Sequence, residues 1–129
     1  MRPARVFLAE DDGDHIMLLR RALGRYPRPI ELTIARDGQQ AIEILARGEP
    51  PDLVLLDINM PRRTGFEVLE ALRADPRLAP VPAAMLTTSA RAEDREQSAA
   101  LGADAFVTKP TSFRAFTDAL FALLDRHLG

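Results

Sequence analysis

The chain has 129 residues, enough for one compact domain with a single hydrophobic core. Its 17 basic and 19 acidic residues give a formal net charge of −2, so it has no basic excess with which to hold a nucleic-acid backbone. It has no cysteine, which excludes disulfide bonds, thiolate metal sites and thiol nucleophiles. The first apolar run is too short for a signal peptide or a membrane span, so we expect a soluble cytoplasmic protein that binds neither nucleic acid nor membrane.

Short apolar runs alternate with segments of helical periodicity along the chain. The runs predict five strands, at residues 6–9, 30–35, 53–56, 82–87 and 105–107. Apolar residues at helical spacing predict five helices, at residues 16–23, 41–45, 64–74, 90–101 and 112–127. Glycine or proline follows four of these helices, as expected where a helix ends, at Gly24, Gly48, Pro76 and Gly102.

Alternating strands and helices predict an α/β fold, a mostly parallel sheet with helices on both faces, because parallel strands need crossover connections. The run 53–56 is apolar without alternation, which is typical of a central strand. In open sheets of this kind, ligands bind beyond the carboxyl ends of the strands. The polar residues at those ends are Glu10, Asp11, Asp12, Asp57, Asn59, Thr87, Thr88, Ser89 and Lys109.

Carboxylates that converge at one sheet edge repel one another, so a divalent cation is expected among them. Oxygen ligands with room for several waters favour Mg²⁺. Lys109 supplies an ammonium at the same edge, and Thr87 supplies a hydroxyl that can donate to an anion. With these groups around it, Asp57 is expected to be a nucleophile that accepts a phosphoryl group.

Five separated segments of the chain resemble, in type and order, a two-component response regulator receiver domain. They are Glu10-Asp11, Asp57, MPRRTG at 60–65, LTTS at 86–89 and TKP at 108–110. The resemblance implies a flavodoxin-like fold, a doubly wound five-stranded parallel sheet of order 2-1-3-4-5 with five helices. It also implies a single receiver domain over residues 1–129 with no output domain.

The same resemblance implies a role for each acidic residue. Asp57 is the expected phosphoacceptor. Glu10 and Asp11 are the expected metal carboxylates, of which Asp11 is the direct ligand. Asp57 and the main-chain carbonyl of Asn59 are expected to complete the Mg²⁺ shell.

Three further roles come from the resemblance. Thr87 is the expected switch hydroxyl and Phe106 the expected switch aromatic. Lys109 is expected to contact the phosphoryl group. The bond between Lys109 and Pro110 is expected to be cis, an isomer that X–Pro bonds tolerate.

Two longer segments resemble one group within this family. LTTSARAED and LGADAFVTKPTSFRAF are similar to the single-domain regulators that serve bacterial phytochrome-type histidine kinases, which implies such a kinase as partner. Two residues depart from the family pattern: Thr64 stands where an acidic residue is usual, and Thr88 stands where a smaller residue is common. Both raise the question of how long a phosphoryl group would remain.

Some polar residues have a simpler interpretation. Asp12 could be a third metal ligand, but an aspartate that opens a helix is more often its N-cap, and we favour the cap. His15 and His127 have no partner at ligand spacing, so we interpret both as structural.

The fourth and fifth predicted helices differ in how they can be anchored. The closing helix has an apolar stripe of about 160°, wider than a core-facing helix needs. The helix over 90–101 is mostly charged and should be loosely held. We therefore expect a homodimer through the fourth helix, fifth strand and closing helix, remodelled by phosphorylation.

Two other classes of function remain open. A Mg²⁺-dependent phosphatase with an aspartyl nucleophile normally needs an acid two residues further on, where this chain has Asn59. A docking or dimerisation module would have the pocket but take no phosphoryl group. We favour a phosphoacceptor that catalyses only its own phosphorylation and dephosphorylation, and is otherwise not an enzyme.

Overall fold

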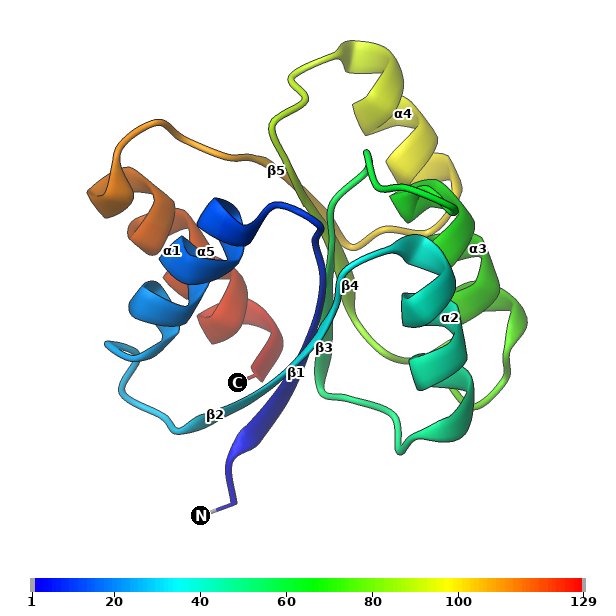
Figure 1. Ribbon diagram of the computed structural model, residues 1–129, viewed down its shortest axis with the longest axis horizontal. Coiled ribbons are helices and arrows are strands. Elements are labelled where there is room, and N and C mark those ends of the chain that lie inside the picture. The colour runs from blue at the N-terminus through cyan, green and yellow to red at the C-terminus, as the bar shows by residue number, and fades with distance from the viewer. Residues whose placement is uncertain (1, 129) are drawn as a thin grey trace.

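The computed structural model describes residues 2–128, which form five parallel strands and five helices in strict alternation (Figure 1). The strands are β1 Ala4–Ala9, β2 Ile30–Ala35, β3 Leu53–Leu56, β4 Ala83–Thr87 and β5 Ala105–Thr108. The helices are α1 Gly13–Leu23, α2 Gly38–Arg47, α3 Gly65–Ala74, α4 Ala92–Ala100 and α5 Phe113–Leu128. The sheet order is β2-β1-β3-β4-β5 with every pair parallel, which confirms the predicted flavodoxin-like fold.

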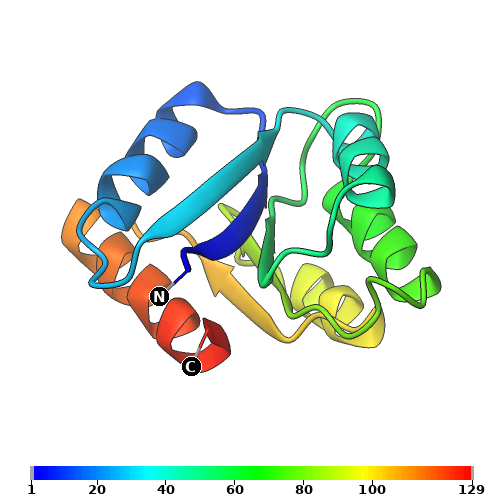
Figure 2. The same ribbon diagram turned by 90° about the horizontal axis from the view of Figure 1, so that it is seen from below.

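Helices cover both faces of this sheet. In Figures 1 and 2, α1 and α5 lie on one face, and α2, α3 and α4 on the other. The central strand β3 serves both cores, because its side chains point alternately to the two faces. Val54 and Leu56 belong to the core under α2 and α3, whereas Leu53 and Leu55 belong to the core under α1 and α5. All four are fully buried, so β3 fixes where the chain reaches the carboxyl edge of the sheet.

Three helix starts differ from the prediction by two or three residues. Helix α1 begins at Gly13, three residues earlier, because the Asp12 carboxylate caps it by accepting from the Asp14 backbone N–H at 2.9 Å. Helix α2 begins at Gly38, three residues earlier, because the Asp37 carboxylate caps it by accepting from the Gln40 backbone N–H at 2.7 Å. Helix α4 begins at Ala92, two residues later, and no side chain caps it. Only Ser98 of α4 is buried, in agreement with the predicted weak anchoring.

The wide apolar stripe of α5 has a partner inside the molecule. The Phe121 ring packs edge-on against Tyr26, with the ring centroids 5.0 Å apart. At the start of α5 the Ser112 hydroxyl caps the helix by accepting from the Ala115 N–H at 3.0 Å. Part of the stripe is therefore used by the fold itself.

The predicted cis bond is wrong: Lys109–Pro110 is trans, and no peptide bond within residues 2–128 is cis. Trans is the lower-energy isomer of an X–Pro bond by about 0.5–1 kcal/mol. The Lys109 N–H donates to the Thr87 carbonyl at 2.7 Å, so the chain leaves β5 in line with the β4–β5 ladder. No helix within residues 2–128 has both the length and the apolar content needed to cross a membrane.

Candidate functional site

The acidic residues meet at the carboxyl ends of β1 and β3. The Asp57 N–H donates to the Ala9 carbonyl, and the Glu10 N–H donates to the Ala35 carbonyl, each at 3.0 Å. These backbone bonds extend the sheet by one residue and place the two acids side by side. Carboxylate oxygens of Glu10, Asp11 and Asp57 all lie within 4.8 Å of one another. Three of the residues that the strand pattern pointed to are thus brought together.

The three carboxylates differ in their surroundings. Glu10 and Asp57 are buried, at 2% and 8% exposure, whereas Asp11 is exposed. Burial raises the pKa of Glu10, with a further increase from Asp57, and the hydrogen bond from Lys109 opposes it. Two buried acids beside one exposed acid, with a single ammonium nearby, need more positive charge than the chain supplies. The donor set fits a hard divalent cation that keeps water on its open side.

The loop after Asp57 holds this acid in place. The Ile58 N–H donates to Asp57 Oδ1 at 2.8 Å, and the Gly65 N–H donates to the Ile58 carbonyl at 2.9 Å. A Cβ at Gly65 would lie 2.1 Å from the Asp57 carbonyl oxygen, so only glycine fits there. Thr64 caps α3 through a capping box with Glu67, which gives this departure from the family pattern a structural role.

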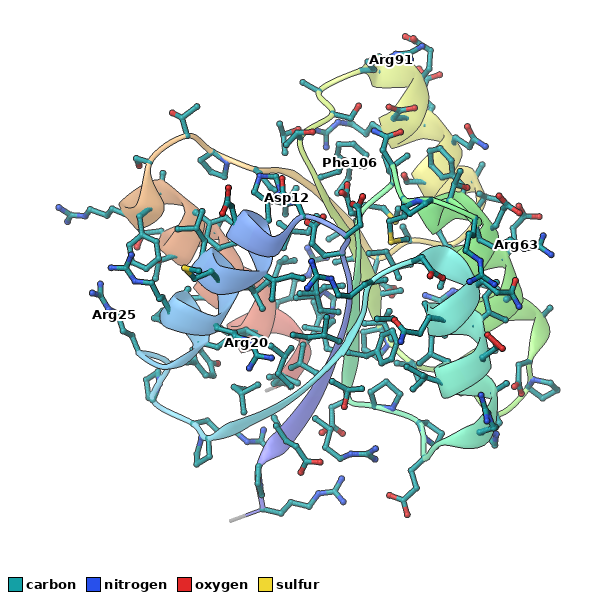
Figure 3. The ribbon with its side chains drawn as sticks, in the orientation of Figure 1. Asp12, Arg20, Arg25, Arg63, Arg91 and Phe106 are labelled. Atoms are coloured by element: carbon teal, nitrogen blue, oxygen red, sulfur yellow. The ribbon has the colours of Figure 1, made fainter. Side chains whose placement is uncertain are left out.

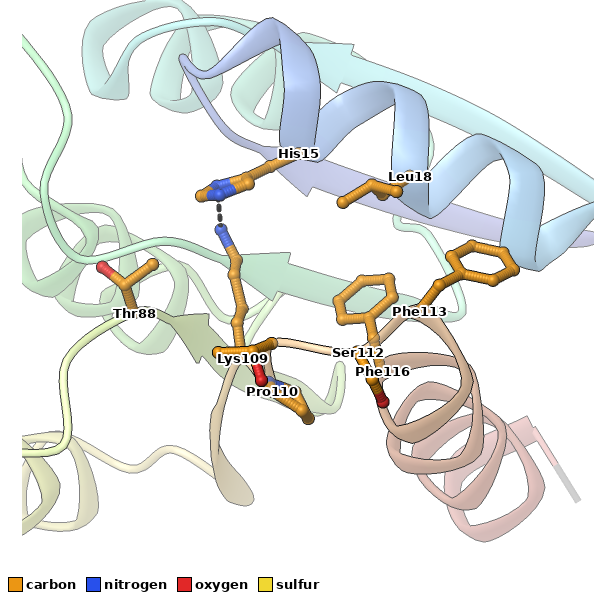
Figure 4. A pocket seen from close by; sticks show the side chains of 9 residues that line it. His15, Leu18, Thr88, Lys109, Pro110, Ser112, Phe113 and Phe116 are labelled. Atoms are coloured by element: carbon orange, nitrogen blue, oxygen red, sulfur yellow. Dashed lines mark hydrogen bonds between the residues drawn. The ribbon is translucent and has the colours of Figure 1, made fainter.

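Lys109 reaches the pocket from the end of β5. Its Nζ donates to the Glu10 carboxylate and lies 2.9 Å from Nδ1 of His15. Figure 4 draws the contact between Lys109 and His15 as a dashed line. Among the described residues Lys109 forms an ion pair with Glu10 and none with Asp57. The interpretation of His15 as an isolated histidine is therefore wrong. No local sequence signal indicates this contact, because His15 and Lys109 lie 94 positions apart in the chain.

Thr87 and its neighbours connect the pocket to α4. The buried Thr87 hydroxyl accepts from the Ser89 N–H at 3.3 Å. The Ser89 hydroxyl donates to Asp94 of α4 at 2.5 Å, and its carbonyl accepts from the Thr108 hydroxyl at 2.8 Å. Thr88, the second departure, is exposed and lines a cavity of about 290 Å³ between α1 and the start of α5.

Phe106 lies half-buried on β5 beneath α4. The guanidinium of Arg95 covers its ring, with Cζ 4.6 Å from the ring centroid. In Figure 3 Arg91, at the N-cap position of the same helix, points outward instead. Phe106 is thus held between the sheet and a charged side chain of the most weakly anchored helix.

Two other predicted residues lie at the rim. Asp12 accepts from the N–H groups of Asp14 and His15, at 2.9 and 3.4 Å, which confirms it as the N-cap of α1. It is not one of the three clustered carboxylates. Asn59 is exposed, and the role of its main-chain carbonyl stays a prediction.

Comparison with known sequences identifies the family. Residues 6–121 match the response regulator receiver domain, so the chain belongs to this family. A probable cyclic di-GMP phosphodiesterase of Vibrio cholerae is 37% identical over 107 residues, which are 83% of this chain and 23% of that protein. The probable methanogenesis regulatory protein FilR2 of Methanothrix harundinacea is 33% identical over 132 residues, covering 98% of this chain and 85% of that protein. The chain therefore spans less than a quarter of the first relative and most of the second.

Comparison with solved structures shows which members of the family this chain resembles in three dimensions. The phosphorylated cyanobacterial phytochrome response regulator RcpA superposes with a TM-score of 0.92 at 30% identity, covering 99% of this chain and 96% of that one. The Mn²⁺-bound form of response regulator Rcp1 gives 0.86 at 31% identity, with 95% and 93% covered. The bacteriophytochrome response regulator RtBRR gives 0.77 at 35% identity, with 92% and 76% covered. Phytochrome response regulators are thus among the structures to which this chain is similar.

Proposed function

We propose that this receiver domain accepts a phosphoryl group on Asp57 from a histidine kinase and passes the signal on by protein contact. The observation that carries the proposal is the cluster of Asp57, Glu10 and Asp11 at one sheet edge, with the chain's single lysine bonded to it. The likeness to phosphorylated RcpA supports Asp57 as the acceptor, and the likeness to RtBRR supports a kinase of the bacteriophytochrome type.

Each residue would have a defined part in the transfer. An Asp57 carboxylate oxygen would form the new bond to phosphorus while the donor's bond to the phosphoryl group breaks. Glu10, Asp11, Asp57 and the Asn59 carbonyl would hold Mg²⁺, which when bound supplies positive charge next to the transferred oxygens. Lys109 and Thr87 would donate hydrogen bonds to those oxygens. The Mn²⁺-bound form of Rcp1 supports the binding of a divalent ion.

The signal would leave through α4, β5 and α5. Thr87 and Phe106 would change position when the phosphoryl group is present, and the loosely held α4 would follow them. A shallow, partly apolar depression between β5 and α5 lies on the same face and is bordered by Phe106, Val107 and Leu123. We propose that this face is a homodimer contact and that the protein acts in the cytoplasm.

Two rival functions predict different results. A phosphatase lacks its leaving-group acid here, because residue 59 is asparagine and exposed. A docking module would take no phosphoryl group at all. The receiver, by contrast, should be labelled stoichiometrically and should turn over no external metabolite beyond small phosphodonors.

Labelling with acetyl phosphate and Mg²⁺, followed by intact-mass measurement, tests the proposal. We expect one phosphoryl group per chain and none in Asp57→Asn. Asp12→Asn is the matched control, because asparagine is an equally good N-cap and the phosphoacceptor remains. Label that persists in Asp57→Asn, or multiple turnover without label, would contradict the proposal.

A further inference from the structure

His15 stands in a position that the proposed chemistry does not use. It lies in the first turn of α1, and its Nδ1 is 2.9 Å from Lys109 Nζ and 3.5 Å from Glu10 Oε1. The three side chains are mostly covered, with exposed fractions of 30% for His15, 8% for Lys109 and 2% for Glu10. An ammonium has three donors and no acceptor, so Nδ1 of His15 must accept this hydrogen bond.

These two contacts hold the ammonium on the α1 side of the pocket. Within the described part of the chain no ion pair joins Lys109 to Asp57. A lysine has a flexible four-carbon stem, so one partner alone leaves its ammonium several positions. Glu10 and His15 together hold the ammonium in one of these positions. Figure 4 shows the Lys109 side chain extending toward the His15 imidazole.

We propose that His15 is a positioning residue that, with Glu10, gives Lys109 a resting position from which its ammonium must turn to reach a phosphoryl group on Asp57. This inference rests on the proposed function. A contact that stabilises the resting state and is lost during transfer slows the transfer. Removing His15 should therefore speed labelling, whereas loss of a merely structural histidine should slow it.

The first test is the labelling rate with acetyl phosphate and Mg²⁺, together with the affinity for beryllium fluoride as a phosphoryl mimic. In His15→Ala we expect both to increase by about three- to tenfold, because the net effect of an ordinary hydrogen bond, after exchange with water, is of this size. His15→Asn should return both toward the starting values, since its side-chain oxygen can accept at the place of Nδ1. Leu18→Ala is the matched control, because Leu18 lines the same cavity from α1 and is not bonded to Lys109.

Combining the His15 and Lys109 substitutions distinguishes a positioning role of His15 from a general disturbance of the pocket. In a Lys109→Met background the His15→Ala effect on rate and affinity should disappear. An effect of the same size in that background, or a labelling rate that is unchanged or lower in His15→Ala, would overturn the proposal.

A second readout does not depend on phosphorylation. Because Lys109 is the only lysine, protein labelled with ¹⁵N-lysine has one side-chain ammonium signal. This signal should shift in His15→Ala and stay in place in Leu18→Ala. If the signal shifts but the protein takes no label, the proposed function fails while the contact stands; if it does not shift, the positioning role is wrong.

Discussion

The guanidinium of Arg95 lies over the ring of Phe106, with Cζ 4.6 Å from the ring centroid, and Nη1 of Arg95 is 3.5 Å from the Phe106 carbonyl oxygen. Helix α4 thus contacts the expected switch aromatic through a charged side chain. The helix buries only Ser98 and has no side-chain cap, so it is otherwise weakly anchored.

Replacing Arg95 by alanine should therefore loosen Phe106. An exposed cation–π contact contributes about 0.5–1 kcal/mol, so the ratio of Phe106 ring positions should change by about two- to fivefold. Fluorine NMR of protein labelled with fluorophenylalanine would measure this ratio, with the Phe106 signal assigned by Phe106→Leu.

Arg91→Ala provides the comparison at the N-cap position of the same helix. Arg91 pairs with Glu93, 3.0 Å away, and has no aromatic contact among the described residues. The Phe106 signal should not respond to this change. Equal responses in both variants would mean that helix content, and not the contact over the ring, determines where Phe106 lies.

The capping box of α3 should make stability depend on acid pH. The hydrogen bond from the Thr64 backbone N–H lowers the pKa of Glu67 below its usual 4.5. The hydrogen bond from the Arg63 side chain lowers this pKa further. A carboxyl group whose pKa is lower in the folded state stabilises the fold above 4.5, and this stabilisation is lost as pH falls through the lower folded-state pKa. Glu67→Gln should thus be less stable than the parent protein at neutral pH, and the difference should shrink below pH 4.5.

Urea unfolding across this pH range would measure that difference. Glu70→Gln is the control, because Glu70 is exposed on the same helix and forms no hydrogen bond or ion pair among residues 2–128. Thr64→Ala should cost about 1 kcal/mol at neutral pH, whereas Thr64→Asp should keep the cap. A Thr64→Asp variant with normal stability then allows the phosphoryl lifetime to be compared without a change in folding.

The sequence predicted the features that depend on local patterns. The apolar run 53–56 indicated a central strand, and the position of Asp57 directly after it predicted the acidic pocket. The contact of His15 with Lys109 joins residues 94 positions apart, which no periodicity reveals. The trans bond at Lys109–Pro110 could also not be predicted from the sequence. The energy difference between the two isomers is small, so the surrounding loop determines which isomer forms.

Gly65→Ala should damage both the fold and the site. The added Cβ would lie 2.1 Å from the Asp57 carbonyl oxygen and 2.9 Å from its carbon, so the loop would have to move. We expect a loss of about 1–3 kcal/mol in the free energy of unfolding and slower labelling of Asp57. Gly13→Ala tests whether any added methyl group does the same. A Cβ at Gly13 would have an Arg36 nitrogen at 3.5 Å as its nearest neighbour, so this variant should be as stable as the parent protein or more stable.

Magnesium should stabilise the protein through three carboxylates and not through Asp12. An ion that binds only the folded state at ten times its dissociation constant adds about 1.4 kcal/mol, which is roughly 5 °C in melting temperature for a domain of this size. Asp11→Asn should remove most of this increase, because it removes the exposed carboxylate of the cluster.

Asp12→Asn distinguishes the two interpretations of that residue by differential scanning calorimetry with Mg²⁺ and with a chelator. Asparagine caps a helix as well as aspartate does, so the bonds from the Asp14 and His15 N–H groups have a replacement. If Asp12 is only the cap, the increase in melting temperature with Mg²⁺ stays the same. A smaller increase in Asp12→Asn would mean that its carboxylate takes part in holding the ion, and the site would then contain four acids.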